Sequence, residues 1–99
     1  MKLTSLKKAL VVEDNEINQI VSSKMLESIG FDIDIANDGL EAVDMVNKSH
    51  YDIVFMDLQM PNMDGFEATK KIREFNKTIP IIALSAAVMD KDKELTSLA

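Results

Sequence analysis

The sequence contains no cysteine, and it has few prolines and glycines, with 2 and 3 residues in a chain of 99. Without cysteine, neither a disulfide framework nor a thiolate metal site is available, which is compatible with a cytoplasmic protein. Because proline and glycine are sparse and scattered, no stretch has the composition of a long linker. We therefore expect a single small domain over residues 1–99.

Long apolar runs are missing as well. None approaches the roughly 20 residues that a membrane-spanning helix needs, and the start of the chain lacks the pattern of a signal peptide, so we expect no membrane contact by this segment. The formal net charge is -6. A surface of that sign repels the phosphates of DNA and RNA, which argues against a nucleic acid partner.

Short, continuous apolar runs are what the sequence does contain. Continuous rather than alternating hydrophobicity is typical of strands in a parallel sheet that is covered on both faces. A further run alternates apolar with acidic residues and indicates an edge strand with one wetter face. The continuous runs are residues 9–12, 53–56 and 79–84, and the alternating run is residues 31–36.

Helical patterns separate these runs. Apolar residues between positions 17 and 29 fall on one face of a helix, and Gly30 follows where a left-handed cap would lie. Two acidic pairs have the spacing of helix caps and predict two further helix starts, and a last helix is predicted from Asp90. The face comprises Ile17, Ile20, Val21, Met25 and Ile29; the pairs are Asp38 with Glu41 and Asp64 with Glu67. Strands alternating with helices predict a doubly wound parallel α/β sheet.

Polar side chains directly follow three of the predicted strands. Glu13 and Asp14 follow the first continuous run, Asp57 follows the second and Ser85 follows the last. Ligands of such sheets bind at the carboxyl ends of the strands. If these strands are neighbours, the four side chains converge in one pocket.

Three carboxylates at close range repel one another, and a divalent cation relieves that repulsion. Hard oxygen ligands without histidine or cysteine favour Mg²⁺, which also neutralises charge on a phosphoryl group. Asp57 is central and is the natural nucleophile for an aspartyl phosphate, while Ser85 can donate its hydroxyl to a phosphoryl oxygen. Simpler roles compete: Asp14 can cap the helix that begins near Glu16, and Ser85 can be a turn residue.

At three motifs the sequence resembles the receiver domains of response regulators in two-component signalling, most similarly those of hybrid sensor histidine kinases. The motifs are residues 9–19, 52–65 and 80–86. The resemblance implies a flavodoxin-like sheet with strand order 2-1-3-4-5. It also implies a phosphoryl group delivered by a histidine kinase or histidine phosphotransfer protein, in the cytoplasm or in the cytoplasmic part of a membrane-bound sensor kinase.

The resemblance further implies a role for each matching residue. Asp57 is the phosphoacceptor, Asp14 binds magnesium directly, and Glu13 does so mostly through water. The backbone carbonyl of Gln59 is a third metal ligand. Such a receiver catalyses its own phosphorylation and dephosphorylation.

Two further positions match residues that act after phosphorylation. Ser85 corresponds to the switch hydroxyl, whose movement repacks a face that partners contact. Gln59 and Ala87 lie where the family tunes the lifetime of the phosphoryl group.

The chain departs from the family at its end. It stops at Ala99, so the fifth strand and helix, and the lysine after that strand, are not in this sequence, and the receiver is expected to be C-terminally incomplete. Loss of the fifth strand would expose the apolar fourth strand, which favours a homodimer or strand exchange through that edge. A stable monomer in dilute solution would count against this expectation.

Other functions remain as alternatives. A metal-dependent phosphatase would want a second aspartate at position 59, which is Gln59 here, and a dinucleotide-binding domain would want a glycine-rich loop after the first strand. The stronger alternative is a truncated pseudo-receiver, a protein-binding or dimerisation module without phosphorylation.

Overall fold

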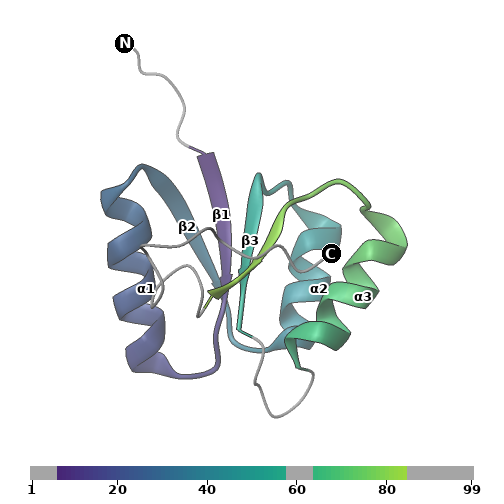
Figure 1. Ribbon diagram of the computed structural model, residues 1–99, viewed down its shortest axis with the longest axis horizontal. Coiled ribbons are helices and arrows are strands. Elements are labelled where there is room, and N and C mark those ends of the chain that lie inside the picture. The colour runs from purple at the N-terminus through teal and green to yellow at the C-terminus, as the bar shows by residue number, and fades with distance from the viewer. Residues whose placement is uncertain (1–6, 58–63, 85–99) are drawn as a thin grey trace.

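The computed structural model describes residues 7–57 and 64–84, where strands and helices alternate along the chain (Figure 1). The strands are β1 (Lys7–Val12), β2 (Phe31–Ala36), β3 (Ile53–Met56) and β4 (Ile81–Ala83), and the helices are α1 (Glu16–Ser28), α2 (Gly39–Lys48) and α3 (Gly65–Phe75). The predicted α/β alternation is confirmed over these ranges, with a shorter last strand than predicted. None of the helices within them is long and apolar enough to span a membrane.

All the strand pairs in the sheet are parallel, and the strand order is β2-β1-β3-β4. This is the predicted order as far as the described residues extend, and β2 lies at an edge as its alternating pattern indicated. The order reverses between β1 and β3, which is where ligands of doubly wound sheets bind. The register pairs Val12 with both Ala36 and Met56, so β1, β2 and β3 end side by side.

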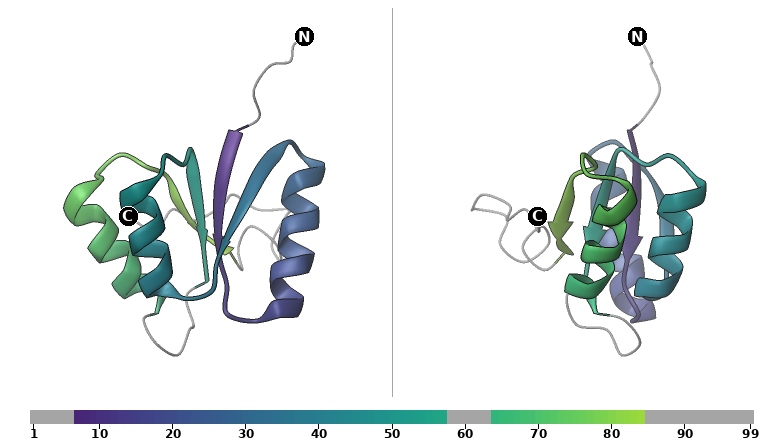
Figure 2. Two further views of the ribbon diagram at one scale, coloured as in Figure 1. Left: turned by 180° about the vertical axis from the view of Figure 1, so that it is seen from behind. Right: turned by 90° about the vertical axis from the view of Figure 1, so that its right-hand side faces the viewer.

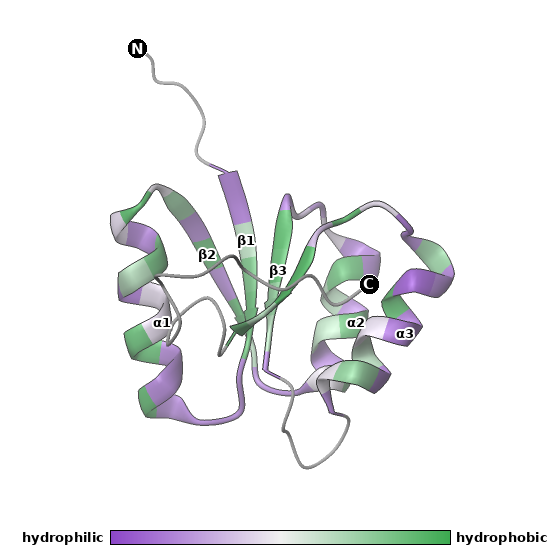
Figure 3. Cartoon of the chain, viewed as in Figure 1, coloured by the Kyte–Doolittle hydropathy of each residue, from purple (hydrophilic) through white to green (hydrophobic). Residues whose placement is uncertain are grey.

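Helices cover both faces of the sheet. Helix α1 lies on one face and helices α2 and α3 lie on the other (Figures 1 and 2). In β1, Leu10 and Val12 join the core beneath α2 and α3, while Ala9 and Val11 join the core beneath α1, and all four are fully buried. Figure 3 shows β1 changing from hydrophilic at its start to hydrophobic along its length. Burial on both faces explains why this strand has no alternating pattern.

Side-chain caps begin each of the three helices in the described ranges. Asp38 and Asp64 accept hydrogen bonds from the backbone N–H groups of Glu41 and Glu67, both at 2.8 Å, so both predicted caps are confirmed. Helix α1 is capped by Asn15, whose Oδ1 accepts from the N–H of Asn18 at 3.0 Å. The alternative prediction that Asp14 caps this helix is therefore wrong. The Asp14 side chain is exposed and does not cap the helix.

The apolar face predicted for α1 exists, but it does not pack on the sheet. The helix buries Ser22 and Leu26 instead, while Ile17 is 71% exposed and Ile29 is 69% exposed. Because Ser22 is small, the helix can approach the sheet along the row that contains Ser22 and Leu26. Gly30 then ends the helix with φ 109°, the left-handed conformation that its position predicted.

An acidic cluster at the carboxyl edge of the sheet

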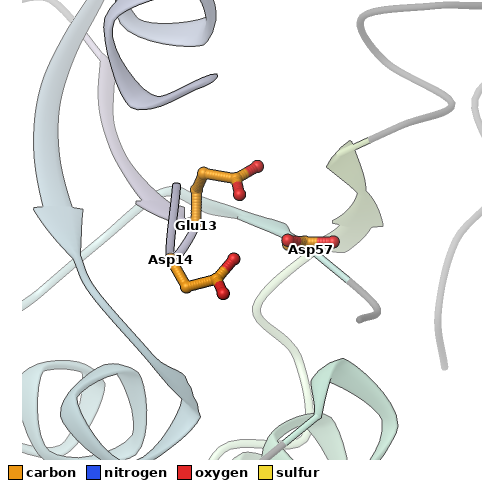
Figure 4. Close-up of side chains that lie close together, drawn as sticks. All are labelled: Glu13, Asp14 and Asp57. Carbon is orange, nitrogen blue, oxygen red and sulfur yellow. The ribbon is translucent and has the colours of Figure 1, made fainter. Parts of the chain in front are cut away.

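Three carboxylates meet where β1 and β3 end (Figure 4). Glu13, Asp14 and Asp57 each offer a carboxylate oxygen, and these oxygens lie within 4.8 Å of one another. The backbone N–H of Asp57 donates to the carbonyl of Val12 at 2.9 Å, which extends the pairing of the two strands by one residue. The sheet itself therefore brings the three acids together, although Asp57 is far from the other two in the sequence.

Glu13 is held by burial and by hydrogen bonds of its backbone and its side chain. It is only 4% exposed, its backbone N–H donates to the carbonyl of Ala36 at 3.1 Å, and its Oε2 accepts from the N–H of Asn15 at 3.1 Å. Asp14 is exposed and Asp57 is half-buried. The cluster therefore has one buried carboxylate and two that a ligand can reach from solvent.

Burial raises the pKa of Glu13 from 4.5 to about 7, the hydrogen bond from Asn15 opposes this rise, and the charge of Asp57 adds to it. The cause is the cost of holding a negative charge out of water beside another negative charge. A cation bound between these groups would favour the ionised form of Glu13. The electrostatics of the acidic cluster therefore favour the binding of a cation.

The metal-free chain should lose stability as the pH rises from about 4.5 to about 7. In that window the folded chain keeps a proton on Glu13 that the unfolded chain releases, so the folded state binds more protons and each rise in pH disfavours it. We expect a loss of about 3 kcal/mol across the window. Urea unfolding at a series of pH values in a chelator measures it.

The matched variant is Glu13→Gln, which cannot ionise and should flatten this part of the pH profile. If the variant keeps the wild-type slope between these pH values, another group is responsible for it.

The donor set of the cluster fits magnesium. The groups that it presents are carboxylate oxygens, the hard ligands that Mg²⁺ prefers, and one or two carboxylates with waters make a usual magnesium site. Neither histidine nor cysteine is among them, so nothing in the donor set selects for zinc or copper.

Two residues beside the cluster were not singled out from the sequence. The side-chain amide of Gln19 donates to the backbone carbonyl of Glu13 at 2.7 Å and to Oδ1 of Asn37 at 2.8 Å. Asn37 directly follows β2, so its place at the same sheet edge was the available signal. The position of Gln19, one helical turn after the cap Asn15, gave no indication of the contact.

The remaining predicted site residues lie outside the described residues. These are Gln59, Ser85 and Ala87, together with the helix predicted from Asp90. Their roles stay predictions.

A second polar group lies near the start of β3, away from the acidic cluster. His50 has a side chain that is 85% exposed, with its Nε2 3.3 Å from Oδ1 of Asp52. The backbone N–H of Lys8 donates to Asp52, and this bond, followed by the one to His50, lowers the pKa of Asp52. This carboxylate ties the start of β1 to the segment before β3.

Comparison with protein families gives a match over most of the chain. The profile described as "Response regulator receiver domain" matches residues 9–97. Hybrid signal transduction histidine kinase B of Dictyostelium discoideum is 43% identical over 102 residues, which covers 90% of this chain and 5% of that protein. The chain spans only 5–7% of the length of the first three curated relatives that it matches.

Solved structures give the same result. The receiver domain of sensor histidine kinase PA1611 from Pseudomonas aeruginosa PAO1, with a magnesium ion in its active site cleft, is 35% identical with a TM-score of 0.76, covering 91% of this chain and 76% of that one. TrrA of Thermotoga maritima in complex with histidine kinase ThkA is 33% identical with a TM-score of 0.74, covering 79% and 67%. The fold is therefore flavodoxin-like.

Proposed function

This chain belongs to the response regulator receiver domain family, and we propose that Asp57 is the residue that accepts a phosphoryl group from a partner's histidine. Receivers of this family act in two-component phosphorelays with histidine kinases. The observation that carries the proposal is the meeting of three carboxylate oxygens within 4.8 Å at the ends of adjacent strands. Asp57 is one of the two acids in the cluster that solvent reaches.

In the transfer step, a carboxylate oxygen of Asp57 forms a bond to phosphorus as the phosphorus–nitrogen bond of the donor phosphohistidine breaks. The electron pair of the broken bond stays on the imidazole nitrogen, which takes up a proton. The product is an acyl phosphate on Asp57. The backbone bond from Asp57 to Val12 fixes the residue at the end of β3, which reduces the ordering needed at the moment of reaction.

Glu13, Asp14 and Asp57 are the residues that would hold magnesium, and Gln59 is proposed to add its backbone carbonyl. When bound, the ion supplies positive charge against the phosphoryl oxygens. Support comes from the donor chemistry of the cluster and from the magnesium in the structure of the PA1611 receiver. We assign the switch hydroxyl to Ser85 and the tuning of the acyl phosphate lifetime to Gln59 and Ala87, on the resemblance alone.

Magnesium should raise the midpoint temperature of unfolding of the chain. A ligand that binds only the folded state stabilises it by about 1.4 kcal/mol at ten times its dissociation constant, which corresponds to about 6–11 °C for a domain of this size. Thermal melts with and without the ion measure the shift. Asp14→Asn should remove most of it, because an exposed ligand is lost.

Asp44→Asn is the control for this melt, because Asp44 is an exposed acid on α2 that pairs only with Lys48 among the described ion pairs. An equal rise in midpoint with sodium chloride of the same ionic strength would argue against a magnesium site.

The proposal is tested by incubating the chain with magnesium and a small phosphodonor and measuring its intact mass. Gain of one phosphoryl group supports a receiver that catalyses its own phosphorylation, and slow loss of that group supports its own dephosphorylation. No gain favours the alternative of a pseudo-receiver that only binds proteins. A phosphatase would instead return to the unmodified mass while it consumed the donor continuously.

We further infer a histidine kinase or histidine phosphotransfer protein as the phosphodonor, supported by the ThkA–TrrA complex, and a cytoplasmic setting.

A second copy of the chain is the other proposed partner. β4 is the outer strand of the described sheet on the side opposite β2, and its apolar edge favours strand pairing between copies. The mass of the chain in dilute solution distinguishes a dimer from a monomer.

A further inference from the structure

The side chain of Gln19 connects two segments of the chain at the acidic edge. Its Nε2 donates to the carbonyl oxygen of Glu13 at 2.7 Å and to Oδ1 of Asn37 at 2.8 Å. A side-chain amide has two N–H donors, and these two acceptors use both. A backbone carbonyl can only accept, so the contact with Glu13 fixes which end of the amide faces the cluster.

The carbonyl that Gln19 contacts belongs to the peptide bond between Glu13 and Asp14. The orientation of this peptide sets the directions in which the two carboxylates leave the backbone. The sheet holds the preceding N–H group, because Glu13 donates to Ala36 at 3.1 Å. Gln19 therefore holds, from helix α1, the part of the turn that lies beyond the sheet.

The second contact of Gln19 continues into α2. The backbone N–H and the side-chain amide of Asn37 both donate to Oε1 of Glu41, at 2.8 and 3.0 Å. The N–H of Glu41 in turn donates to Asp38 at 2.8 Å. A continuous run of hydrogen bonds therefore joins the turn that carries two acids of the cluster to the first turn of α2.

We propose that Gln19 is a positioning residue for the acidic cluster. It holds the Glu13–Asp14 peptide so that both carboxylates face Asp57, and it thereby strengthens the binding of a divalent cation. It contacts neither the cation nor the phosphoryl group. This inference rests on the proposed function, because it concerns the same site.

The test compares magnesium affinity with stability in the 99-residue chain. Gln19→Met keeps a similar length but has no N–H donor, and Asn47→Ala removes an exposed amide from the last turn of α2 as the matched control. Calorimetry gives the magnesium dissociation constant, and thermal melts in a chelator give the stability. Loss of partners around a metal ligand typically weakens binding by 10–100-fold. Gln19 acts through the backbone, so we expect about three- to tenfold weaker binding, with a melting midpoint that matches the control.

A spectroscopic signature gives a second measurement that needs no variant. The side-chain amide signals of Gln19 in a ¹H–¹⁵N spectrum should shift as magnesium is added and should saturate with the same dissociation constant. Those of Asn47 should not move. Unchanged Gln19 signals would overturn the inference even if the Gln19→Met chain failed to fold, because an amide that holds the peptide of a metal ligand must respond to the bound ion.

The outcomes separate this inference from the proposed function. If the wild-type chain binds no magnesium, the proposed metal site fails and Gln19 has nothing to position. If the wild-type chain binds magnesium and Gln19→Met binds it equally well, the proposed function stands and the inference is wrong. A variant that loses affinity only in proportion to a lower melting midpoint would also contradict it.

Discussion

Asp57→Asn should abolish phosphoryl uptake by the chain. The amide nitrogen and oxygen of asparagine keep the shape of the side chain but carry no negative charge, so no oxygen remains that can attack phosphorus at a useful rate. Intact-mass measurement after incubation with magnesium and a small phosphodonor should show one added phosphoryl group on the wild-type chain and none on the variant.

The control for this experiment is again Asp44→Asn, which changes charge by the same amount on the exposed surface of α2. It should take up the group as the wild-type chain does. Hydroxylamine cleaves an acyl phosphate but not a phosphoserine, so it should release the group from the wild-type chain. Uptake by Asp57→Asn, or a group that resists hydroxylamine, would place the modification on another residue and refute the assignment.

Leu10→Ala should destabilise the fold by about 3 kcal/mol, since truncation of a fully buried leucine costs about 2.7–5.0 kcal/mol and leaves a cavity. Leu10 is 0% exposed at the centre of β1, the strand that pairs with both β2 and β3. For a domain of this size the loss corresponds to about 12–24 °C in melting midpoint. A thermal melt followed by circular dichroism measures it.

Leu40→Ala is the matched control, because Leu40 is 56% exposed in the first turn of α2. The same truncation there should change the midpoint by only a few degrees at most. Equal effects of the two substitutions would mean that the sheet core beneath α2 and α3 contributes less to stability than its burial indicates.

Much of the fold could be predicted from local sequence because local physics determines those parts. The continuous apolar run at residues 53–56 predicts a strand buried on both faces, and β3 has those bounds. The pairs Asp38 with Glu41 and Asp64 with Glu67 predict the helix starts, because a cap is a hydrogen bond between residues three apart. Such signals need no knowledge of the rest of the chain.

The orientation of α1 could not be predicted in the same way. Its most apolar row includes Ile17 and Val21, which are exposed, and the row that packs on the sheet holds Ser22 and Leu26. Which row faces the sheet depends on how closely the helix can approach, and therefore on side-chain volumes on both surfaces rather than on hydrophobic spacing.

The identity of the acids in the site could be predicted from the sequence, but their environment could not. The placement of acids directly after strands indicated that Glu13, Asp14 and Asp57 would meet, once the strands were taken as neighbours. The raised pKa of Glu13 and the contacts of Gln19 depend on burial and on the approach of segments far apart in the chain. Spacing along the sequence contains no information on either.

The backbone bond from Asp57 to Val12 determines when the acidic cluster forms during synthesis and folding. A chain synthesised only as far as α2 already carries Glu13 and Asp14, but it has not yet made β3 and cannot bring in the third acid. Asp57, the proposed phosphoacceptor, lies beside Glu13 and Asp14 only when β3 pairs with β1. Under the proposed function, we therefore expect copies in which β3 is unpaired to take up no phosphoryl group.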